Sequence, residues 1–331
     1  RIEAVKSTVL HSSFSFDTSV VELFVPLSAG GTVPVARHLP ELGQLLGMDA
    51  VTCLLLTPST LEALMGDVAI PNSVSLIGVG GEATSRQLVE LVRETSGVDR
   101  MINFYGPTEA SVICIDGALI DRRSEACERK GEEPLIDGRQ DPVTIGSPIQ
   151  NTSAYLLDSR LEPLPIGVVG ELYVGGVCVV RGYLNRPDLT AEVFVPDPYS
   201  AEPGARLYKT GDLVRHLPDG RIEWLGRVDQ QVKVRGFRIE LGAIEAILES
   251  HAAVRQAVAM TREYEGGKSL GQAADRHLAA YVVPATKRPP TVTELRRFLR
   301  ETLPDYMIPS HYVMLDELPL TPNRKVDRSA L

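Results

Sequence analysis

The sequence predicts an α/β protein, in which part of a large layered domain with a parallel sheet and a β-rich subdomain precedes a small α+β C-terminal domain. Three observations lead to this prediction. Continuous apolar runs alternate with helical patterns between residues 51 and 105, as in a buried parallel sheet. Short runs divided by Gly and Pro turns follow from residue 145, as in β structure. Residues 229–331 return to mixed helical and strand patterns, over a length suited to a second domain.

The composition narrows the class of protein. A chain of 331 residues, 44% of them hydrophobic, can bury a sizeable core, and its length suggests about two domains. The net charge of −9 argues against a nucleic-acid or anionic membrane surface, and no apolar run reaches the roughly 18–20 residues of a membrane span. The 4 cysteines are scattered without a CxxC pair, so we expect free thiols in the reducing cytoplasm. The chain begins at Arg1 without a signal-peptide pattern, and we expect it to be a piece of a longer polypeptide.

The first elements are a strand and a helix on either side of Asp17. Phe14 and Phe16 alternate with serines, which predicts a half-buried strand, and an apolar pattern at helical spacing begins after Asp17. An aspartate at this point is commonly a helix N-cap, because its oxygen accepts bonds from unpaired N–H groups. The alternative interpretation is a carboxylate at the mouth of an apolar pocket, waiting for a cation. The pattern leaves both open.

Three βα-like units follow, and polar loops end their strands. A helix is predicted over 85–94, and loops at 57–60 and 80–82 are rich in Gly, Thr and Ser. The carboxyl ends of parallel strands gather at one edge of a sheet, where ligands of such sheets bind. The predicted strands are 51–56, 74–79 and 101–104.

The loop at 103–109, with the sequence Asn-Phe-Tyr-Gly-Pro-Thr-Glu, combines an aromatic ring, a hydroxyl and a carboxylate. The set suits a nucleotide, because the ring can stack on a base, the hydroxyl can bond a phosphate and the carboxylate can hold Mg²⁺. The simpler interpretation is a tight turn between two strands. Residues 117–145 are charged and aperiodic, and we expect a solvated surface loop there that takes no part in chemistry.

The rest of the chain contains the β-rich part and the second domain. Short strands are predicted at 153–157, 170–174, 177–180 and 221–225. The run over 226–240 alternates basic and apolar residues, which taken alone predicts a charged edge strand. In the second domain, helices are predicted over 242–250 and after a capping box at 291–294, strands at 254–260 and 278–283, and a polar loop at 320–331.

Seven stretches in this order resemble motifs of the adenylation domain of non-ribosomal peptide synthetases, within the acyl-adenylate-forming superfamily. The resemblance covers nearly the whole chain except 117–145, and it corresponds to the C-terminal two thirds of such a domain. Ala243 and Arg324 replace a usual Glu and Gly, and neither change removes a catalytic group. The family's phosphate-binding loop, which is expected upstream of Phe16, is absent from the sequence. The seven stretches are 16–19, 103–109, 170–184, 208–213, 226–245, 303–309 and 323–328.

The resemblance implies a ligase that acts in two steps. An amino-acid carboxylate attacks the α-phosphate of ATP to give aminoacyl-AMP and pyrophosphate, and the phosphopantetheine thiol of a carrier protein then takes the acyl group. Glu109 would help to hold Mg²⁺, and Lys325 would be the catalytic cation that bridges the substrate carboxylate and the phosphate. The implied large part is 1–228, and 229–331 is the small mobile part, with its hinge at Asp229 and with Gly236 lining the carrier-arm tunnel. The implied nucleotide-binding residues are Asn103, Tyr105, Gly106, Thr108, Asp212 and Arg227.

The resemblance also implies an amino-acid pocket with Asp17 and Lys325 at its polar end. Asp17 would pair with the α-amino group, because a buried carboxylate needs a cation or donors. The other walls are apolar except for Thr18, so we expect a small or medium aliphatic amino acid. These walls are Thr18, Val21, Leu55, Ile77, Val79, Phe104, Val112 and Ile113.

The implied partners are a peptidyl carrier domain, neighbouring synthetase domains and the upstream half of the adenylation domain, with no nucleic acid and no membrane. Two rival interpretations remain. One is a stand-alone acyl-CoA ligase of the same superfamily, against which the presence of Asp17 argues. The other is a non-catalytic docking fragment, which the missing phosphate loop favours and the presence of Glu109, Asp212 and Lys325 opposes.

Overall fold

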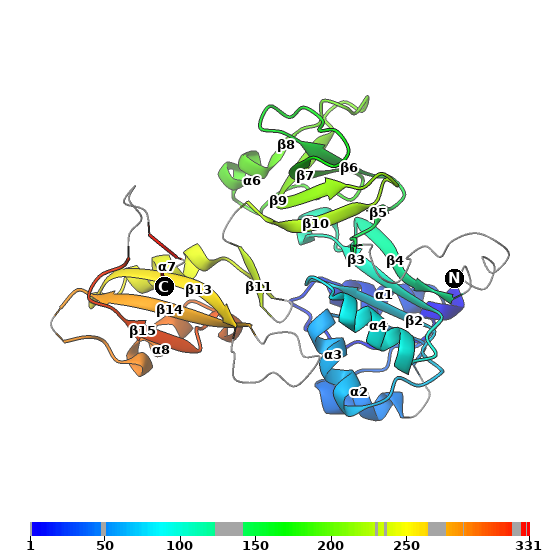
Figure 1. Cartoon of the computed structure of the whole chain (residues 1–331), viewed down its shortest axis with the longest axis horizontal. Coiled ribbons are helices and arrows are strands. Elements are labelled where there is room, and N and C mark those ends of the chain that lie inside the picture. Colours follow the sequence, from blue (N-terminus) through cyan, green and yellow to red (C-terminus); the bar gives the residue numbers. More distant parts are fainter. Residues whose placement is uncertain are drawn as a thin grey trace. The chain divides into compact units, whose positions relative to one another are not determined.

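The computed structural model describes residues 2–47, 51–122, 142–228, 231–234, 237–263, 276–286, 288–319, 326–328 and 330–331. The chain divides into two compact units, residues 1–228 and residues 229–331. Both units mix helices and strands, and the predicted α/β fold class is confirmed (Figure 1). Among the helices in these ranges, none combines the length and the hydropathy of a membrane-spanning segment.

The first sheet of unit 1 has the strand order β1-β2-β3-β4-β5. Its first three strands are parallel to one another, which confirms the parallel sheet expected from the apolar runs. The chain then reverses in a short loop, and β4 pairs antiparallel with β3 and with β5, since parallel neighbours need a long crossover. The strands are β1 (Cys53–Leu56), β2 (Leu76–Gly80), β3 (Arg100–Tyr105), β4 (Ile115–Asp121) and β5 (Ser147–Pro148).

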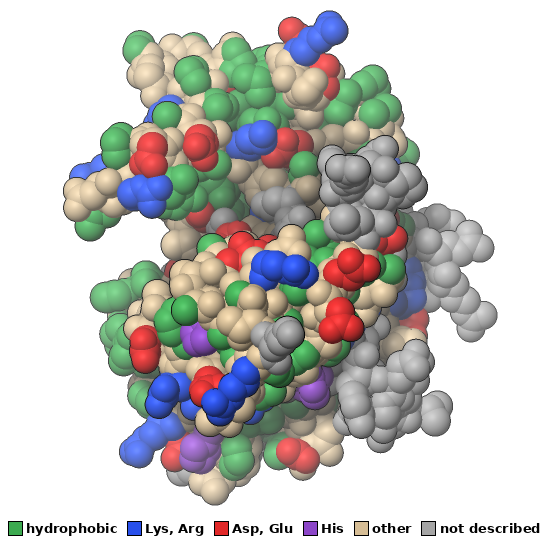
Figure 2. Space-filling view, turned by 90° about the vertical axis from the view of Figure 1, so that its left-hand side faces the viewer, with side chains coloured by type: hydrophobic (Ala, Val, Ile, Leu, Met, Phe, Trp, Pro, Cys, Tyr) green, Lys and Arg blue, Asp and Glu red, His purple; other side chains and the backbone are tan. Residues whose placement is uncertain are grey.

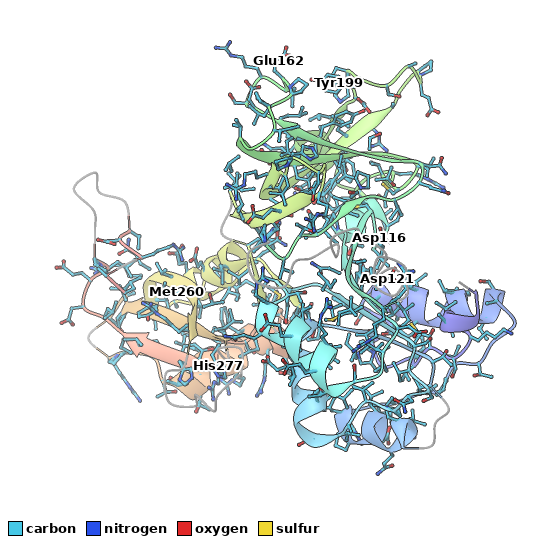
Figure 3. All side chains as sticks on the ribbon, turned by 45° about the vertical axis from the view of Figure 1, so that its right-hand side comes forward. Asp116, Asp121, Glu162, Tyr199, Met260 and His277 are labelled. Carbon is cyan, nitrogen blue, oxygen red and sulfur yellow. The ribbon has the colours of Figure 1, made fainter. Side chains whose placement is uncertain are left out.

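Strand β4 corrects part of the predicted surface loop. Gly117–Asp121 belong to this strand rather than to a loop, and Asp121 pairs with Arg100 of β3 (Arg Nε to Asp Oδ2, 3.3 Å). Figure 3 labels Asp116 and Asp121 along the strand. Residues 123–141 of the charged stretch lie outside the described residues. Charged residues on one face of a half-exposed strand explain why the apolar signal was weak there.

Three capped helices accompany this sheet (Figure 1). The hydroxyl of Thr57 accepts from the Thr60 amide at 3.2 Å, and that of Ser85 accepts from the Leu88 amide at 3.1 Å, so each helix begins directly after a strand-end loop. Leucine and valine side chains from these helices and from β1 and β2 form one buried cluster. The helices are α2 (Leu39–Leu46), α3 (Pro58–Asp67) and α4 (Arg86–Thr95), with short 3-10 turns at Ile2–Val5 and Thr108–Ala110.

Helix α1 (Thr18–Ser28) has its polar side chains inside and its apolar side chains outside. Glu22 is fully buried, whereas Phe24 is 60% exposed. The Glu22 carboxylate accepts from the His11 amide at 3.2 Å, from the Ser12 amide at 3.0 Å and from the Ser12 hydroxyl at 2.8 Å, and it lies 2.7 Å from His11 Nδ1. The apolar spacing therefore predicted the helix correctly but not the side that it buries.

Replacing Glu22 tests this anchoring. We expect Glu22→Ala to lower the free energy of unfolding by about 3 kcal/mol, because the amides and side chains of His11 and Ser12 lose their buried acceptor. Urea denaturation followed by circular dichroism measures the change. The matched control is Glu90→Ala on the exposed face of α4, which should stay within about 0.5 kcal/mol of the parent. Equal losses in the two variants would show that the Glu22 contacts contribute little.

The second sheet of unit 1 is antiparallel, with the order β10-β9-β7-β6 and with β8 paired to β9. Its apolar face packs with Tyr105, Cys114 and Ile115, so the core of this sheet includes the loop that follows β3. No strand forms at 177–180, where the Val180 amide bonds the Glu109 carbonyl at 3.0 Å instead. The elements are β6 (Thr152–Leu157), β7 (Val169–Gly176), α6 (Pro187–Val193), β8 (Phe194–Pro196), β9 (Arg206–His216) and β10 (Ile222–Arg227).

Unit 2 is an α+β module. Strands β13 and β14 pair antiparallel, β15 adds to β14 in parallel, and Ile244, Leu248, Leu295 and Leu299 pack from two helices into their core. The expected capping box forms between Thr291 and Glu294. Figure 2 shows a face of the molecule on which basic and acidic side chains are interspersed. The elements are β11 (Val232–Val234), β12 (Phe237–Ile239), α7 (Leu241–Glu249), β13 (Val254–Glu263), β14 (Arg276–Pro284), α8 (Val292–Arg300), a 3-10 turn (Asp305–Met307) and β15 (His311–Met314).

Candidate functional site

The loop that follows β3 folds back tightly on itself. A Cβ on Gly106 would lie 2.3 Å from the Val112 carbonyl oxygen, so only glycine permits this approach. Val112 has a φ of 73°, which is a rare conformation for a β-branched residue and marks strain of the kind found at functional sites. The fold-back returns the chain to β3, where the Cys114 amide bonds the Tyr105 carbonyl at 2.9 Å. The loop therefore holds its aromatic, hydroxyl and carboxylate groups in a fixed arrangement.

Asp212 on β9 is the centre of a buried polar cluster. Its carboxylate is 6% exposed and accepts from the Tyr105 hydroxyl at 2.6 Å. Arg227 lies 3.1 Å from the other oxygen, and the indole N–H of Trp224 donates to that same oxygen at 2.8 Å. Burial and the Asp212 carboxylate raise the pKa of Tyr105 well above its usual range, so the phenol stays a donor. Three residues that the sequence predicted separately thus lie together, and Trp224 joins them without having been predicted.

Asn103 is buried on β3 and is held by two threonines that the sequence analysis missed. Its amide nitrogen donates to the Thr144 carbonyl at 2.8 Å, and its amide oxygen accepts from the Thr84 hydroxyl at 3.3 Å. Thr144 lies within the stretch that was expected to be an inert loop, so that expectation is wrong at this residue. No short-range signal marks these contacts, because their partners are separated by 19 and 41 positions in the chain.

Asp17 occupies the N-cap position of α1, yet its side chain makes no capping hydrogen bond. Its carboxylate accepts instead from the Thr108 hydroxyl at 2.5 Å. The simpler N-cap interpretation is therefore wrong. The bond places the carboxylate expected to bind an ammonium beside the hydroxyl expected to bind a phosphate.

Glu109 is buried beside Thr108 and accepts from the Tyr183 hydroxyl at 2.6 Å. Among the described residues no group of three or more His, Cys, Asp or Glu side chains could hold a metal ion by itself. One carboxylate with a neighbouring hydroxyl nevertheless fits Mg²⁺, which usually binds through one or two carboxylates, water and the phosphates of a substrate. Tyr183 was not among the predicted site residues, although it belongs to the 170–184 motif.

The register of the first sheet corrects the predicted substrate pocket. Leu55 pairs with Gly78, and Phe104 pairs with Gly80, so these residues share one face of the sheet. Ile77 and Val79 point to the opposite face, where they are fully buried in the core with the helices. The prediction that Ile77 and Val79 line the pocket with Phe104 is therefore wrong. The alignment was displaced by one residue, and side chains alternate between the two faces of a strand.

Gly78 and Gly80 make room for the Phe104 ring. A Cβ on Gly80 would lie 2.4 Å from ring carbons of Phe104, and a Cβ on Gly78 would lie 2.7 Å from the Leu55 side chain. The ring therefore lies against bare backbone and fills the space that side chains would otherwise take. The remaining predicted wall residues are half-buried, and they come from the first turn of α1 (Thr18 and Val21) and from the fold-back loop (Val112 and Ile113).

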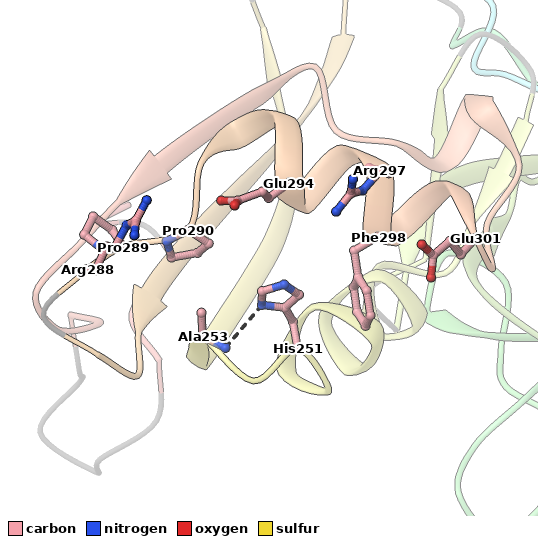
Figure 4. A pocket seen from close by; sticks show the side chains of 9 residues that line it. All are labelled: His251, Ala253, Arg288, Pro289, Pro290, Glu294, Arg297, Phe298 and Glu301. Atoms are coloured by element: carbon pink, nitrogen blue, oxygen red, sulfur yellow. Dashed lines mark hydrogen bonds between the residues drawn. The ribbon is translucent and has the colours of Figure 1, made fainter.

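Three predicted residues, Lys325, Asp229 and Gly236, lie outside the described residues. Unit 2 has a separate surface pocket of about 340 Å³ (Figure 4). Its lining contains none of the predicted site residues. In this pocket the Ala253 amide donates to Nδ1 of His251 at 3.2 Å, and Phe298 packs edge-on against the same ring. The lining residues are His251, Ala253, Arg288, Pro289, Pro290, Glu294, Arg297, Phe298 and Glu301.

Two family models match the chain. The model described as AMP-binding enzyme matches residues 3–184, and the model described as AMP-binding enzyme C-terminal domain matches residues 243–325. The first covers the Asp17 helix, the loop after β3 and Tyr183, and the second falls within unit 2.

Curated relatives are much longer than this chain. A linear gramicidin synthase of Brevibacillus parabrevis is 45% identical over 336 residues, an alignment that covers 100% of this chain and 4% of the relative. Phosphinothricin tripeptide synthetase PhsC of Streptomyces viridochromogenes is 42% identical over 327 residues, which is 97% of this chain and 27% of the relative. The chain thus spans a small part of the relatives that it matches.

Solved structures share the fold. A non-ribosomal peptide synthetase protein that contains adenylation and PCP domains, bound to a vinylsulfonamide inhibitor, superposes with a TM-score of 0.81 at 25% identity, over 100% of this chain and 53% of that one. An artificially fused adenylation–PCP di-domain from Klebsiella oxytoca gives a TM-score of 0.75 at 25% identity, over 93% of this chain and 53% of that one.

Proposed function

Because the chain belongs to the AMP-binding enzyme family, as an adenylation domain of a non-ribosomal peptide synthetase, we propose that it activates an amino acid with ATP and passes it to a carrier protein. The first step forms aminoacyl-AMP and releases pyrophosphate. The second transfers the acyl group to the phosphopantetheine thiol of a peptidyl carrier domain. Neighbouring synthetase domains and that carrier are the proposed partners.

One observation above all supports the first step, namely the hydrogen bond between Asp17 and Thr108. An enzyme that joins an amino acid to a nucleotide must hold an ammonium and a phosphate a few ångströms apart. Asp17 supplies the charge for the ammonium, and Thr108 supplies a donor for the phosphate. Attack of a carboxylate on phosphorus depends chiefly on positioning and charge neutralisation, which these side chains can provide.

The nucleoside part of ATP is assigned to the Asp212 cluster and the loop after β3. Asp212 would accept from the ribose hydroxyls, with Arg227 beside it, while Tyr105 and Asn103 would contact the adenine. Gly106 would keep the backbone close to the nucleotide. Glu109 would contribute the carboxylate that holds Mg²⁺, and the ion would neutralise charge on the phosphates when bound.

Residues outside the described ranges complete the proposal. By resemblance, Lys325 is the catalytic cation, Asp229 the hinge and Gly236 part of the tunnel for the carrier arm. The preceding part of the adenylation domain would supply the phosphate-binding loop. The exposed apolar side chains of α1, such as Phe24, offer that part a contact surface.

The substrate proposal is a small or medium aliphatic amino acid. Leu55, the Phe104 ring and the backbone of Gly78 and Gly80 form an apolar surface, and the ring occupies much of the room above the glycines. A charged side chain would find no partner on these walls.

Replacing Phe104 should enlarge this pocket. We expect Phe104→Ala to raise the ratio of kcat/KM for phenylalanine to kcat/KM for valine by at least about tenfold, since removing the ring opens space above Gly78 and Gly80. Pyrophosphate exchange with each amino acid measures the ratio. Ile77→Val is the matched control, because Ile77 lies on the opposite face and its substitution should leave the ratio unchanged. A shift with Ile77→Val and none with Phe104→Ala would reverse the corrected pocket assignment.

ATP–pyrophosphate exchange with a panel of amino acids tests the proposed function. The assay uses this chain completed by the preceding part of the domain, in cis or as a second chain. Exchange that depends on an amino acid, followed by loading of a carrier protein, supports the proposal. Exchange with acyl or aryl acids and thioester formation on free coenzyme A would indicate a stand-alone ligase. No exchange with any acid would indicate a docking module.

A further inference from the structure

The contact between Trp224 and Asp212 depends on an irregularity in β10. Strand β10 pairs Trp224 with Val214 and Arg227 with Asp212, with a bulge between Trp224 and Gly226. In a regular strand, residues three positions apart face opposite sides. The bulge inserts one residue, so Trp224 and Arg227 reach the same face as Asp212. Gly226 has a φ of 147°, a conformation that few other residues adopt.

The donors around Asp212 are divided unequally between its two oxygens. Oδ1 accepts from Trp224 Nε1 at 2.8 Å and from Arg227 at 3.1 Å, which uses both of its lone pairs. Oδ2 accepts from the Tyr105 hydroxyl at 2.6 Å, which is the only donor to Oδ2 among the described residues. The carboxylate is thus fixed in one rotation, with Oδ2 turned toward the loop after β3.

We propose that Trp224 is a positioning residue for nucleotide binding, which holds Oδ1 of Asp212 so that Oδ2 presents its remaining lone pair to a ribose hydroxyl. The inference rests on the proposed function, because it takes Asp212 as the ribose acceptor. Trp224 packs its ring against the buried cluster that includes Tyr105, so the indole is itself held in place. The bulge, the indole and the arginine together fix the acceptor before the nucleotide arrives, and this lowers the cost of ordering it on binding.

The first test is kinetic. Trp224→Phe keeps an aromatic ring and removes the N–H donor, so KM for ATP should rise about tenfold while kcat changes by less than about twofold. The matched control is Tyr199→Phe, which also removes one donor from an aromatic side chain in unit 1. Tyr199 donates to the Leu161 carbonyl and lies beside Glu162 (Figure 3), so its loss should leave both constants unchanged.

The second test needs no substitution. The chain has 1 tryptophan, so its indole N–H gives a single nuclear magnetic resonance signal. The hydrogen bond to Asp212 should make this proton exchange slowly with deuterium, and added AMP should shift its signal. This measurement decides the matter if Trp224→Phe fails to fold.

The outcomes separate this inference from the proposed function. If the parent enzyme catalyses exchange but Trp224→Phe keeps the parent KM for ATP, the positioning role is overturned and the function stands. A fast-exchanging indole proton that ignores AMP, in an active enzyme, overturns it equally. If the parent neither catalyses exchange nor responds to AMP, the proposed function has failed and the inference fails with it.

Discussion

With Asp17→Val, the adenylation domain should use α-amino acids roughly 10²- to 10³-fold less efficiently, measured as kcat/KM in pyrophosphate exchange. The reason is that the substrate ammonium would lose its carboxylate partner, and breaking such a buried ion pair costs roughly 3–5 kcal/mol. Asp17 makes no helix-capping bond, so its removal should not unfold α1. The Thr108 hydroxyl would lose its acceptor at 2.5 Å, but the hydroxyl is exposed and water can replace it.

The control for Asp17 lies in the choice of substrate. The matching α-keto and α-hydroxy acids have no ammonium, so their use should change by less than about threefold in Asp17→Val. A thermal melt of the variant checks that the domain remains folded. An equal loss for amino and keto acids would assign Asp17 a structural role and remove it from substrate recognition.

Asp212→Asn should have the second large effect, raising KM for ATP by roughly 100-fold. The amide has one acceptor oxygen in place of two, so it cannot accept at once from Tyr105, Trp224, Arg227 and a ribose. It also leaves the guanidinium of Arg227, 3.1 Å away and largely buried, without its counter-charge. Pyrophosphate exchange at varied ATP concentration measures the change.

A second nucleotide provides the control for Asp212. The parent enzyme should prefer ATP to 2′-deoxyATP, because the deoxy sugar lacks one hydroxyl for the carboxylate. In Asp212→Asn this preference should shrink toward unity, whereas a variant that was merely less stable would keep it. An undiminished preference would place the ribose away from Asp212.

The sequence predicted the fold class well because its signals are local. Alternating apolar runs and helical patterns identified β1 to β3 and the helices between them, and the Thr291 capping box identified α8. The resemblance also joined Tyr105 to Asp212, which are 107 positions apart and hydrogen-bonded in the structure. Local spacing alone could not have done so.

The errors have physical causes. Strand β2 is apolar on both faces, so hydrophobicity does not reveal which residues face the pocket, and a slip of one residue placed Ile77 and Val79 there in error. Helix α1 has a clear apolar stripe, but Glu22 is buried because His11 and Ser12 satisfy it. Trp224 escaped notice because its contact depends on a bulge, which hydrophobic periodicity does not show.

The packing of Phe104 on Gly78 and Gly80 has a consequence for how this enzyme could diverge during evolution. The two faces of the sheet are independent: one contains the core around Ile77 and Val79, and the other contains a ring on bare backbone. A mutation at Phe104 can change the size of accepted substrates without disturbing the hydrophobic core. A lineage can therefore sample new amino-acid specificities by single substitutions while its thermodynamic stability stays nearly constant.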